Sequence, residues 1–370
     1  MPHLEAEVYN GMMHARTENF SDHPYFHAAA LALEGDTAKL RGLKMRYPTW
    51  KAAWESLAAK GSAPAPEAAW ETLLRTHISL VLQEDALFPA LLRETPLPPL
   101  GLYVRGTLPP DTQPALAIVG TRKATRNGRE LAHALARELS SSFSIVSGLA
   151  LGVDAAAHAG CLEGNGHTVA VLAGGVDAPQ PQTNAGLAAR ILEQDGALVS
   201  EYPPGSAPVP YRFLERNRIV SGLSRGVVIV EAPEGSGSLV TARLALEQNR
   251  EVFVLPGPVT HPNFRGSHAL IRAGARLVCN AADILEDLGY AEDANSPQPS
   301  RVLPPLSADE EVVTAALRDA VAPLSVDSII GVTSLQPSVV NRALSFLLVK
   351  NVVQETEGGY ALRHYHAESQ

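Results

Sequence analysis

The sequence has little cysteine and lacks long apolar runs. Its 370 residues hold two isolated cysteines, Cys161 and Cys279, with no CxxC pair and no cluster of cysteine and histidine. The sequence therefore predicts neither a disulfide framework nor a metal site. The longest apolar runs are strand-sized, well short of the roughly 18 residues that a membrane-spanning helix needs. The first 20 residues contain no apolar core segment, so we expect a cytoplasmic protein with no secretory signal and no membrane partner.

Two familiar nucleotide-binding motifs are also missing. The sequence has no GxxxxGK[ST] loop, and no GxGxxG follows its first predicted parallel strand. A P-loop and a dinucleotide site of the NAD type are therefore not supported, and we expect no cofactor.

The net charge of −9 argues against a protein that coats DNA indiscriminately. The charge is uneven along the chain: residues 1–115 carry a net charge of −3, residues 116–276 carry +2, and residues 277–370 carry −8. The middle segment has 14 arginines and one lysine. Arginine suits phosphate oxygens and stacks on bases, so an anionic partner is expected to bind this segment.

The middle segment also carries the pattern of a parallel sheet. Between Ala115 and Val278, seven short and unbroken apolar runs alternate with segments of about 15–25 residues, enough for crossover helices. This alternation predicts an α/β fold with a doubly wound, mostly parallel sheet. Ligands of such sheets bind beyond the carboxyl ends of the strands. The expected strands are ALAIV, FSIV, TVAVL, ALVS, GVVIV, EVFVL and RLV.

Small and cationic residues accumulate on that edge of the predicted sheet. Small residues let backbone N–H groups approach a phosphate, so four such turns on one edge predict a phosphate-binding cleft rather than plain architecture. We expect the third of them to open a helix. The four are Gly120-Thr121-Arg122-Lys123, Ser147-Gly148-Leu149-Ala150-Leu151-Gly152, Arg216-Asn217-Arg218 and Gly235-Ser236-Gly237-Ser238-Leu239.

Other residues allow two interpretations. Phe213 is either a base-stacking platform or a core contact. Asp154 and His158 could form an acid/base pair, but a helix cap and a buried histidine are favoured. Glu201 and Glu231 could serve hydrolysis, but each is favoured to hold a neighbouring arginine in place.

The two ends of the chain predict separate domains. We expect a flexible tail at 1–20, a helical domain at 21–100 that buries tryptophans such as Trp50 and Trp54, and a sheet domain at 101–290. The helical segments include EAAWETLLRTHISLVL. A linker rich in proline, serine and acid spans 291–307. Three helices and a hairpin then predict a winged helix at 308–366. The winged helix is poor in cations, which favours a protein-contact role over duplex binding.

The sequence resembles the DNA-processing protein A (DprA/Smf) family of bacteria. The resemblance is strong over roughly residues 85–277. It rests on segments such as AIVGTRKAT, IVSGLALGVDAAAHAG, VSEYPPG, FLERNRIVSG and APEGSGSLVTARLALEQ, which occur in one order. The N-terminal helices and the winged helix also fit the layout of the family, with weaker signals.

The resemblance implies a Rossmann-like domain that binds single-stranded DNA without catalysis. It also implies homodimerisation and loading of the RecA recombinase onto incoming strands during natural transformation. Site residues carried over to this sequence are Gly120, Thr121, Arg122, Lys123, Ser147, Gly148, Leu149, Ala150, Phe213, Arg216, Asn217, Arg218, Gly237 and Ser238.

This sequence departs from the family pattern in two places. Gln180-Pro181-Gln182-Thr183-Asn184 lacks a lysine that is frequent there, and the turn from Leu33 to Thr37 is acidic. Two alternative functions stay open. One is a hydrolase that processes nucleotides in the same cleft with Glu231, and the other is an adaptor that does not bind DNA.

Overall fold

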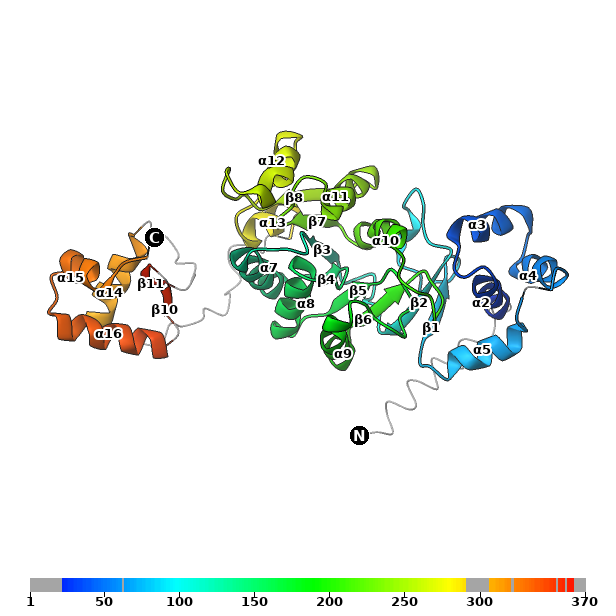
Figure 1. Ribbon diagram of the computed structural model, residues 1–370, viewed down its shortest axis with the longest axis horizontal. Coiled ribbons are helices and arrows are strands. Elements are labelled where there is room, and N and C mark those ends of the chain that lie inside the picture. Colours follow the sequence, from blue (N-terminus) through cyan, green and yellow to red (C-terminus); the bar gives the residue numbers. More distant parts are fainter. Residues whose placement is uncertain are drawn as a thin grey trace. The chain divides into compact units, whose positions relative to one another are not determined.

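A computed structural model describes residues 22–61, 63–290, 306–320, 323–350, 352–356 and 358–362 (Figure 1). The chain divides into two compact units, Met1–Ala291 and Glu292–Gln370, and each is described by itself. The predicted tail at 1–20 and nearly all of the predicted linker at 291–307 lie outside the described residues. Within the described residues, no helix is long and apolar enough to cross a membrane.

The first unit is built on a nine-stranded sheet in the order β1-β2-β6-β5-β4-β3-β7-β8-β9. The seven strands from β3 onward pair in parallel, and β1 and β2 are antiparallel additions at one edge. All seven predicted runs are strands, and the doubly wound α/β fold is confirmed. The strands are β1 Ser79–Leu82, β2 Gly101–Gly106, β3 Ala115–Val119, β4 Ser144–Ser147, β5 Thr168–Val171, β6 Ala197–Ser200, β7 Gly226–Ile229, β8 Glu251–Val254 and β9 Arg276–Leu277.

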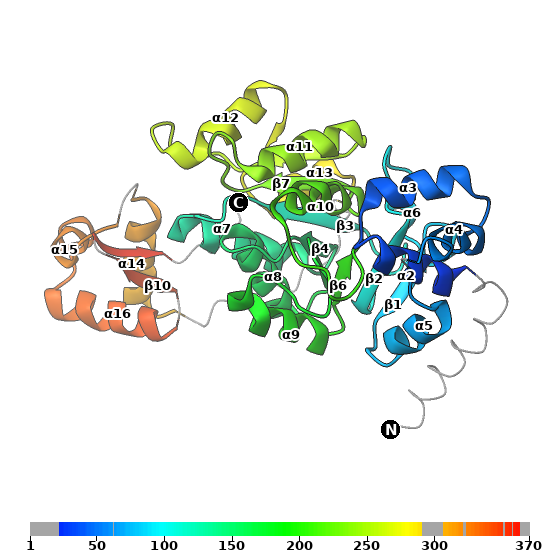
Figure 2. The same ribbon diagram turned by 45° about the vertical axis from the view of Figure 1, so that its right-hand side comes forward.

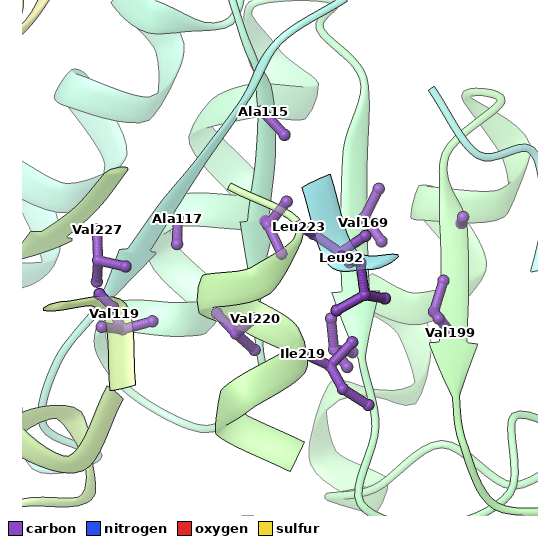
Figure 3. Close-up of a cluster of buried hydrophobic side chains, with 14 of the residues drawn as sticks. Leu92, Ala115, Ala117, Val119, Val169, Val199, Ile219, Val220, Leu223 and Val227 are labelled. Carbon is purple, nitrogen blue, oxygen red and sulfur yellow. The ribbon is translucent and has the colours of Figure 1, made fainter. Parts of the chain in front are cut away.

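Helices cover both faces of this sheet, which is why its strands are apolar without alternation. Side chains of α6 (Ala90–Arg93), α10 (Pro210–Gly222), α11 (Gly237–Glu247) and α12 (Arg265–Arg272) pack on one face. Figure 3 shows Ile219 and Val220 of α10 and its C-cap residue Leu223 in this cluster with Ala117 and Val119 of β3. Side chains of α7 (Arg126–Leu139), α8 (Val153–Glu163), α9 (Ala185–Glu193) and α13 (Ala281–Asp287) pack on the other face.

From residue 22 onward, where the structure describes the chain, four helices precede the sheet: α2 His23–Ala32, α3 Thr37–Arg46, α4 Trp50–Ala58 and α5 Pro66–Leu74. Trp50 is 2% exposed and packs edge-to-face on Phe26, with ring centroids 4.7 Å apart. The favoured burial of this tryptophan is therefore confirmed. Trp54 is partly buried, and its indole N–H donates to the carbonyl of Pro64.

The prediction of one helix through EAAWETLLRTHISLVL is wrong at its carboxyl end. Helix α5 ends at Leu74, and His77 adopts a left-handed backbone with φ 55°. Residues 79–82 form β1, which pairs with β2. Helical and strand periodicities are hard to separate in a short apolar run, and the distant pairing partner decides here.

In the residues of the second unit that the structure describes, there are three helices and a hairpin at the predicted places. They are α14 Ala308–Arg318, α15 Val326–Thr333, α16 Pro337–Val349, β10 Val353–Thr356 and β11 Gly359–Leu362. The unit has its own apolar core, which includes Val313, Ile329, Val340 and Leu347. Ser307 and Glu310 form a capping box at the start of α14, so the helix begins where the sequence pattern places it.

Candidate nucleic-acid interface

A cleft of about 360 Å³ opens at the carboxyl edge of the sheet. Eleven of the fourteen predicted site residues line it: Gly120, Thr121, Arg122, Lys123, Gly148, Ala150, Phe213, Arg216, Asn217, Gly237 and Ser238. The structure does not bring Ser147, Leu149 and Arg218 to the cleft. The lining includes three cations and two carboxylates, Asp154 and Glu234.

The turn after β3 carries the exposed cations of the cleft. Arg122 and Lys123 are both exposed, and the Arg122 guanidinium carbon lies 4.9 Å from the centre of the Phe213 ring. Gly120 is required at this turn, because a Cβ there would press on Val153 and on the carbonyl oxygen of Glu231. The guanidinium of this turn and the Phe213 ring of α10 therefore lie side by side at the mouth of the cleft.

Helix α10 orients the second group of predicted residues. The helix begins at Pro210 and not at Arg216, so the prediction that Arg216 opens a helix is wrong. Residues three and four apart share a helix face, which brings Phe213, Arg216 and Asn217 together toward the cleft. Residues two apart do not face the same way, so Arg218 points elsewhere.

Arg218 is bound behind the cleft. Its guanidinium pairs with the buried carboxylate of Glu201 and donates to the carbonyl of Leu97 at 2.9 Å. The suggestion that Glu201 holds an arginine is therefore confirmed. The expected part of Arg218 in phosphate binding has no support in this arrangement, because its donors are engaged outside the cleft.

Arg216 lies at the floor of the cleft and is 4% exposed. It donates to the carbonyl of Val171, and burial lowers the pKa of its guanidinium while the nearby carboxylate of Asp154 opposes that shift. A Cβ on Gly148 would overlap the guanidinium. A desolvated cation at the floor interacts more strongly with an anion than a cation in bulk water does.

The turn after β4 differs from the prediction of free N–H groups. The N–H groups of Gly148 and Ala150 donate to the Asp154 carboxylate at 3.2 and 3.4 Å. The favoured role of Asp154 as a helix cap is wrong, because the N-cap of α8 is Gly152 and no side chain caps the helix; the Asp154 carboxylate instead binds the turn that precedes α8. The Leu149 side chain is fully buried in the core, although its backbone is left-handed with φ 58°. The Ser147 hydroxyl donates to the carbonyl of Ile118. The positive character of this part of the cleft therefore comes from Arg216 more than from the turn.

The start of α11 supplies hydroxyl groups. The Ser236 hydroxyl caps the helix by accepting from the N–H of Ser238, and the two hydroxyl oxygens lie 2.7 Å apart. Thr241 also lines the cleft one turn further on. The carried-over site residues did not include Ser236, Thr241 or Glu234, although an N-cap serine before a helix is a recognisable signal.

Glu231 is not part of the cleft lining. Its carboxylate is fully buried and accepts from the N–H and hydroxyl of Thr125 and from the amide of Asn263. The suggestion that it holds an arginine is therefore wrong. His158 is also fully buried and bonds to the Thr168 hydroxyl at 2.7 Å. No cluster of three metal-ligating side chains occurs in the described parts of the chain.

Comparison with known proteins places these features in one family. Residues 79–289 match the model of the family described as DNA recombination-mediator protein A. Over 212 residues the chain is 45% identical to Protein Smf of Escherichia coli, which covers 57% of each protein. Over 312 residues it is 36% identical to Protein Smf of a Synechocystis strain, which covers 74% of this chain and 77% of the relative. The chain spans less than two thirds of the length of the Escherichia coli protein.

Among the solved structures that are similar to this chain are two of DNA processing protein A. One is the X-ray structure of DNA processing protein A from Streptococcus pneumoniae, with a TM-score of 0.56, 34% identity and coverage of 63% of this chain and 85% of that one. The other is DNA processing protein A from Helicobacter pylori, with a TM-score of 0.50, 31% identity and coverage of 58% and 97%. The Helicobacter structure is described as revealing a mode of binding single-stranded DNA.

Proposed function

The chain belongs to the DNA recombination-mediator protein A family, and from this premise we propose that its cleft binds single-stranded DNA. Arg122 and Lys123 would neutralise phosphates at the rim, and Arg216 would attract the strand from the floor. The Phe213 ring would stack on a base, which contributes about 1–3 kcal/mol per base in proteins of this kind.

The pairing of Arg122 with Phe213 carries this proposal. A cation and an aromatic ring 4.9 Å apart at the mouth of one cleft match the two chemical features of an unpaired strand, its phosphates and its exposed base faces. The single-strand binding described for the Helicobacter protein supports the same function.

The finer parts of the proposal concern the whole protein. We propose that it is cytoplasmic, that it forms a homodimer, and that it loads RecA onto incoming strands in natural transformation and recombination. Residues 21–100 would be a helical domain, 101–290 the strand-binding domain and 308–366 a winged helix. A dimer would place two clefts on one strand and gain avidity without new contacts.

The hydrolase alternative has less support. A carboxylate that cleaves a glycosidic bond must reach the substrate. Glu231 instead bonds to Thr125 and Asn263 and is fully buried. The adaptor alternative, in which the protein does not bind DNA, does not explain why three cations line the cleft. We therefore expect binding without turnover.

Substitution of Arg122 tests the proposal. Arg122→Ala removes one phosphate contact and the guanidinium that lies over the Phe213 ring. We therefore expect the affinity for single strands to fall more than tenfold at moderate salt. The far-ultraviolet circular dichroism spectrum should be unchanged, because the fold stays intact. The slope of log affinity against log salt should shrink by about 0.7 for the lost contact. Fluorescence anisotropy with a labelled oligonucleotide measures both quantities.

Arg126→Ala is the matched control. Arg126 lies four residues away, is highly exposed, pairs with Glu130 at 2.8 Å and is absent from the cleft lining. The Arg126→Ala variant loses the same charge as Arg122→Ala, but from outside the cleft. Its affinity for single strands should therefore stay within about twofold of that of the unchanged protein. An Arg122→Ala variant that binds as well as the control would overturn the proposal.

A further inference from the structure

Helix α10 is fixed in two different ways along its length. Its carboxyl half is anchored by apolar packing, with Ile219 and Val220 fully or almost fully buried on the sheet (Figure 3). In its amino half, Tyr211 is 56% and Leu214 is 51% exposed. The half that carries the cleft residues therefore depends on polar contacts for its position.

Arg212 supplies the central polar contact in this amino half. Its guanidinium donates to the carbonyl of Glu34 at 2.6 Å and to the carbonyl of Ala207 at 3.0 Å. The guanidinium carbon also lies 4.3 Å from the ring centre of Tyr202, and Arg212 is 7% exposed. Glu34 belongs to the turn between α2 and α3, so this arginine joins the N-terminal helices to α10. Figure 2 shows α3 and α10 as labelled ribbons in the first unit.

Further bonds hold the same side of α10. The Tyr202 hydroxyl donates to Glu215 at 2.7 Å, and Arg218 donates to the carbonyl of Leu97. Gly35 allows the close approach of the α2–α3 turn, because its φ is 71° and a Cβ would lie 3.0 Å from the Pro203 ring. The bonds to Glu34 and Leu97 come from segments that precede the parallel sheet.

We propose that Arg212 is a positioning residue through which the N-terminal helices fix the cleft face of α10. This inference rests on the proposed single-strand binding. Arg212 is adjacent to Phe213, and adjacent helical residues point about 100° apart. It is absent from the cleft lining but lies one turn before Arg216, so it controls the helix turn that presents Phe213 and Arg216. A helix end that is already ordered loses less conformational entropy on binding, which strengthens binding without adding a phosphate contact.

Salt dependence separates positioning from direct contact. For Arg212→Ala we expect about tenfold weaker single-strand binding at every salt concentration. The slope of log affinity against log salt should stay equal to that of the unchanged protein, whereas Arg122→Ala should lower it by about 0.7. Hydrogen exchange of the α10 amides from Phe213 to Asn217 in the free protein should become faster, because the first turns lose their clamp.

Two further variants complete the experiment. Arg75→Ala removes an arginine at the C-cap of α5 whose side chain is 81% exposed, and it should change neither affinity nor exchange. Arg212→Lys keeps the charge, but its single ammonium nitrogen replaces the guanidinium fork that reaches the carbonyls of Glu34 and Ala207. Compared with Arg212→Ala, it should therefore recover part of the affinity and part of the exchange protection. It also keeps the test valid if Arg212→Ala fails to fold.

The outcomes separate this inference from the proposed function. Full affinity and slow exchange in both Arg212 variants would overturn the positioning role and leave the proposed function intact. A slope lowered by about 0.7 would overturn it as well, because Arg212 would then touch a phosphate. Failure of the unchanged protein to bind single strands would overturn the proposed function itself.

Discussion

At the scale of single residues, the cleft depends on a glycine beneath its buried cation. A methyl group on Gly148 would overlap the Arg216 guanidinium. Overpacking of this kind costs about 1–3 kcal/mol. We therefore expect Gly148→Ala to lower the free energy of unfolding by this amount and to weaken single-strand binding, because Arg216 must move. Urea unfolding and anisotropy measure the two effects.

Gly237 provides the comparison for this substitution. It also lines the cleft, at the first residue of α11, but a Cβ there would meet nothing within 4 Å. Alanine favours a helix over glycine by up to about 1 kcal/mol. The Gly237→Ala variant should therefore unfold at a urea concentration equal to or higher than that of the unchanged protein. Equal stability of the two variants would show that the space beneath Gly148 is not restrictive.

The types of residue in the cleft were predictable, but their directions were not. The sequence places Arg122, Phe213 and Arg216 near one sheet edge, and they meet there. It also assigned Arg218 and Leu149 to the cleft, where they do not lie. The direction of Arg218 depends on the residue at which α10 begins, and that of Leu149 on a left-handed backbone. Neither property follows from spacing alone.

At the scale of elements, the strands were the most predictable features. The central parallel strands, such as β3 and β7, are short and fully buried apolar runs, and that pattern can be recognised without knowledge of the neighbouring strands. The strand β1 and the start of α10 were missed for a common reason. Residues 79–82 become a strand only because β2 lies beside them. Helix α10 begins at Pro210, in a segment predicted to precede the helix.

Helix α16 leads to a prediction about duplex DNA. In the described part of the second unit, Arg342 pairs with Asp309 at 3.0 Å and Lys350 pairs with Glu310 at 2.7 Å. Near the end of the helix, Phe346 is 53% exposed. Affinity for duplex DNA depends on cations that are available to phosphates. We therefore expect Arg342→Ala in the full chain to leave the affinity for a 20-base-pair duplex within twofold, measured by anisotropy. A clear, salt-dependent loss would contradict the protein-contact role.

At the scale of the whole molecule, buried histidines link stability to pH. Burial and the charge of Arg216 lower the pKa of His158 to about 3, and burial lowers the pKa of His27 to about 4. Both lie in the first unit, on different elements. In an unfolded chain a histidine has a pKa of about 6.5. Between pH 6.5 and about 4 the unfolded state therefore binds protons that the folded state does not bind.

This difference in bound protons decides whether the free energy of unfolding rises or falls with pH. Stability rises with pH wherever the unfolded state binds more protons, so the first unit should lose stability as the pH falls below 6.5. At pH 5 each histidine should account for about 2 kcal/mol. His158→Gln removes one of these groups, so its stability should change by about 2 kcal/mol less between pH 7 and pH 5. All three tryptophans lie in the N-terminal helices, so tryptophan fluorescence during urea unfolding follows this unit. An equal pH dependence in the variant would mean that His158 takes up a proton while the protein is folded.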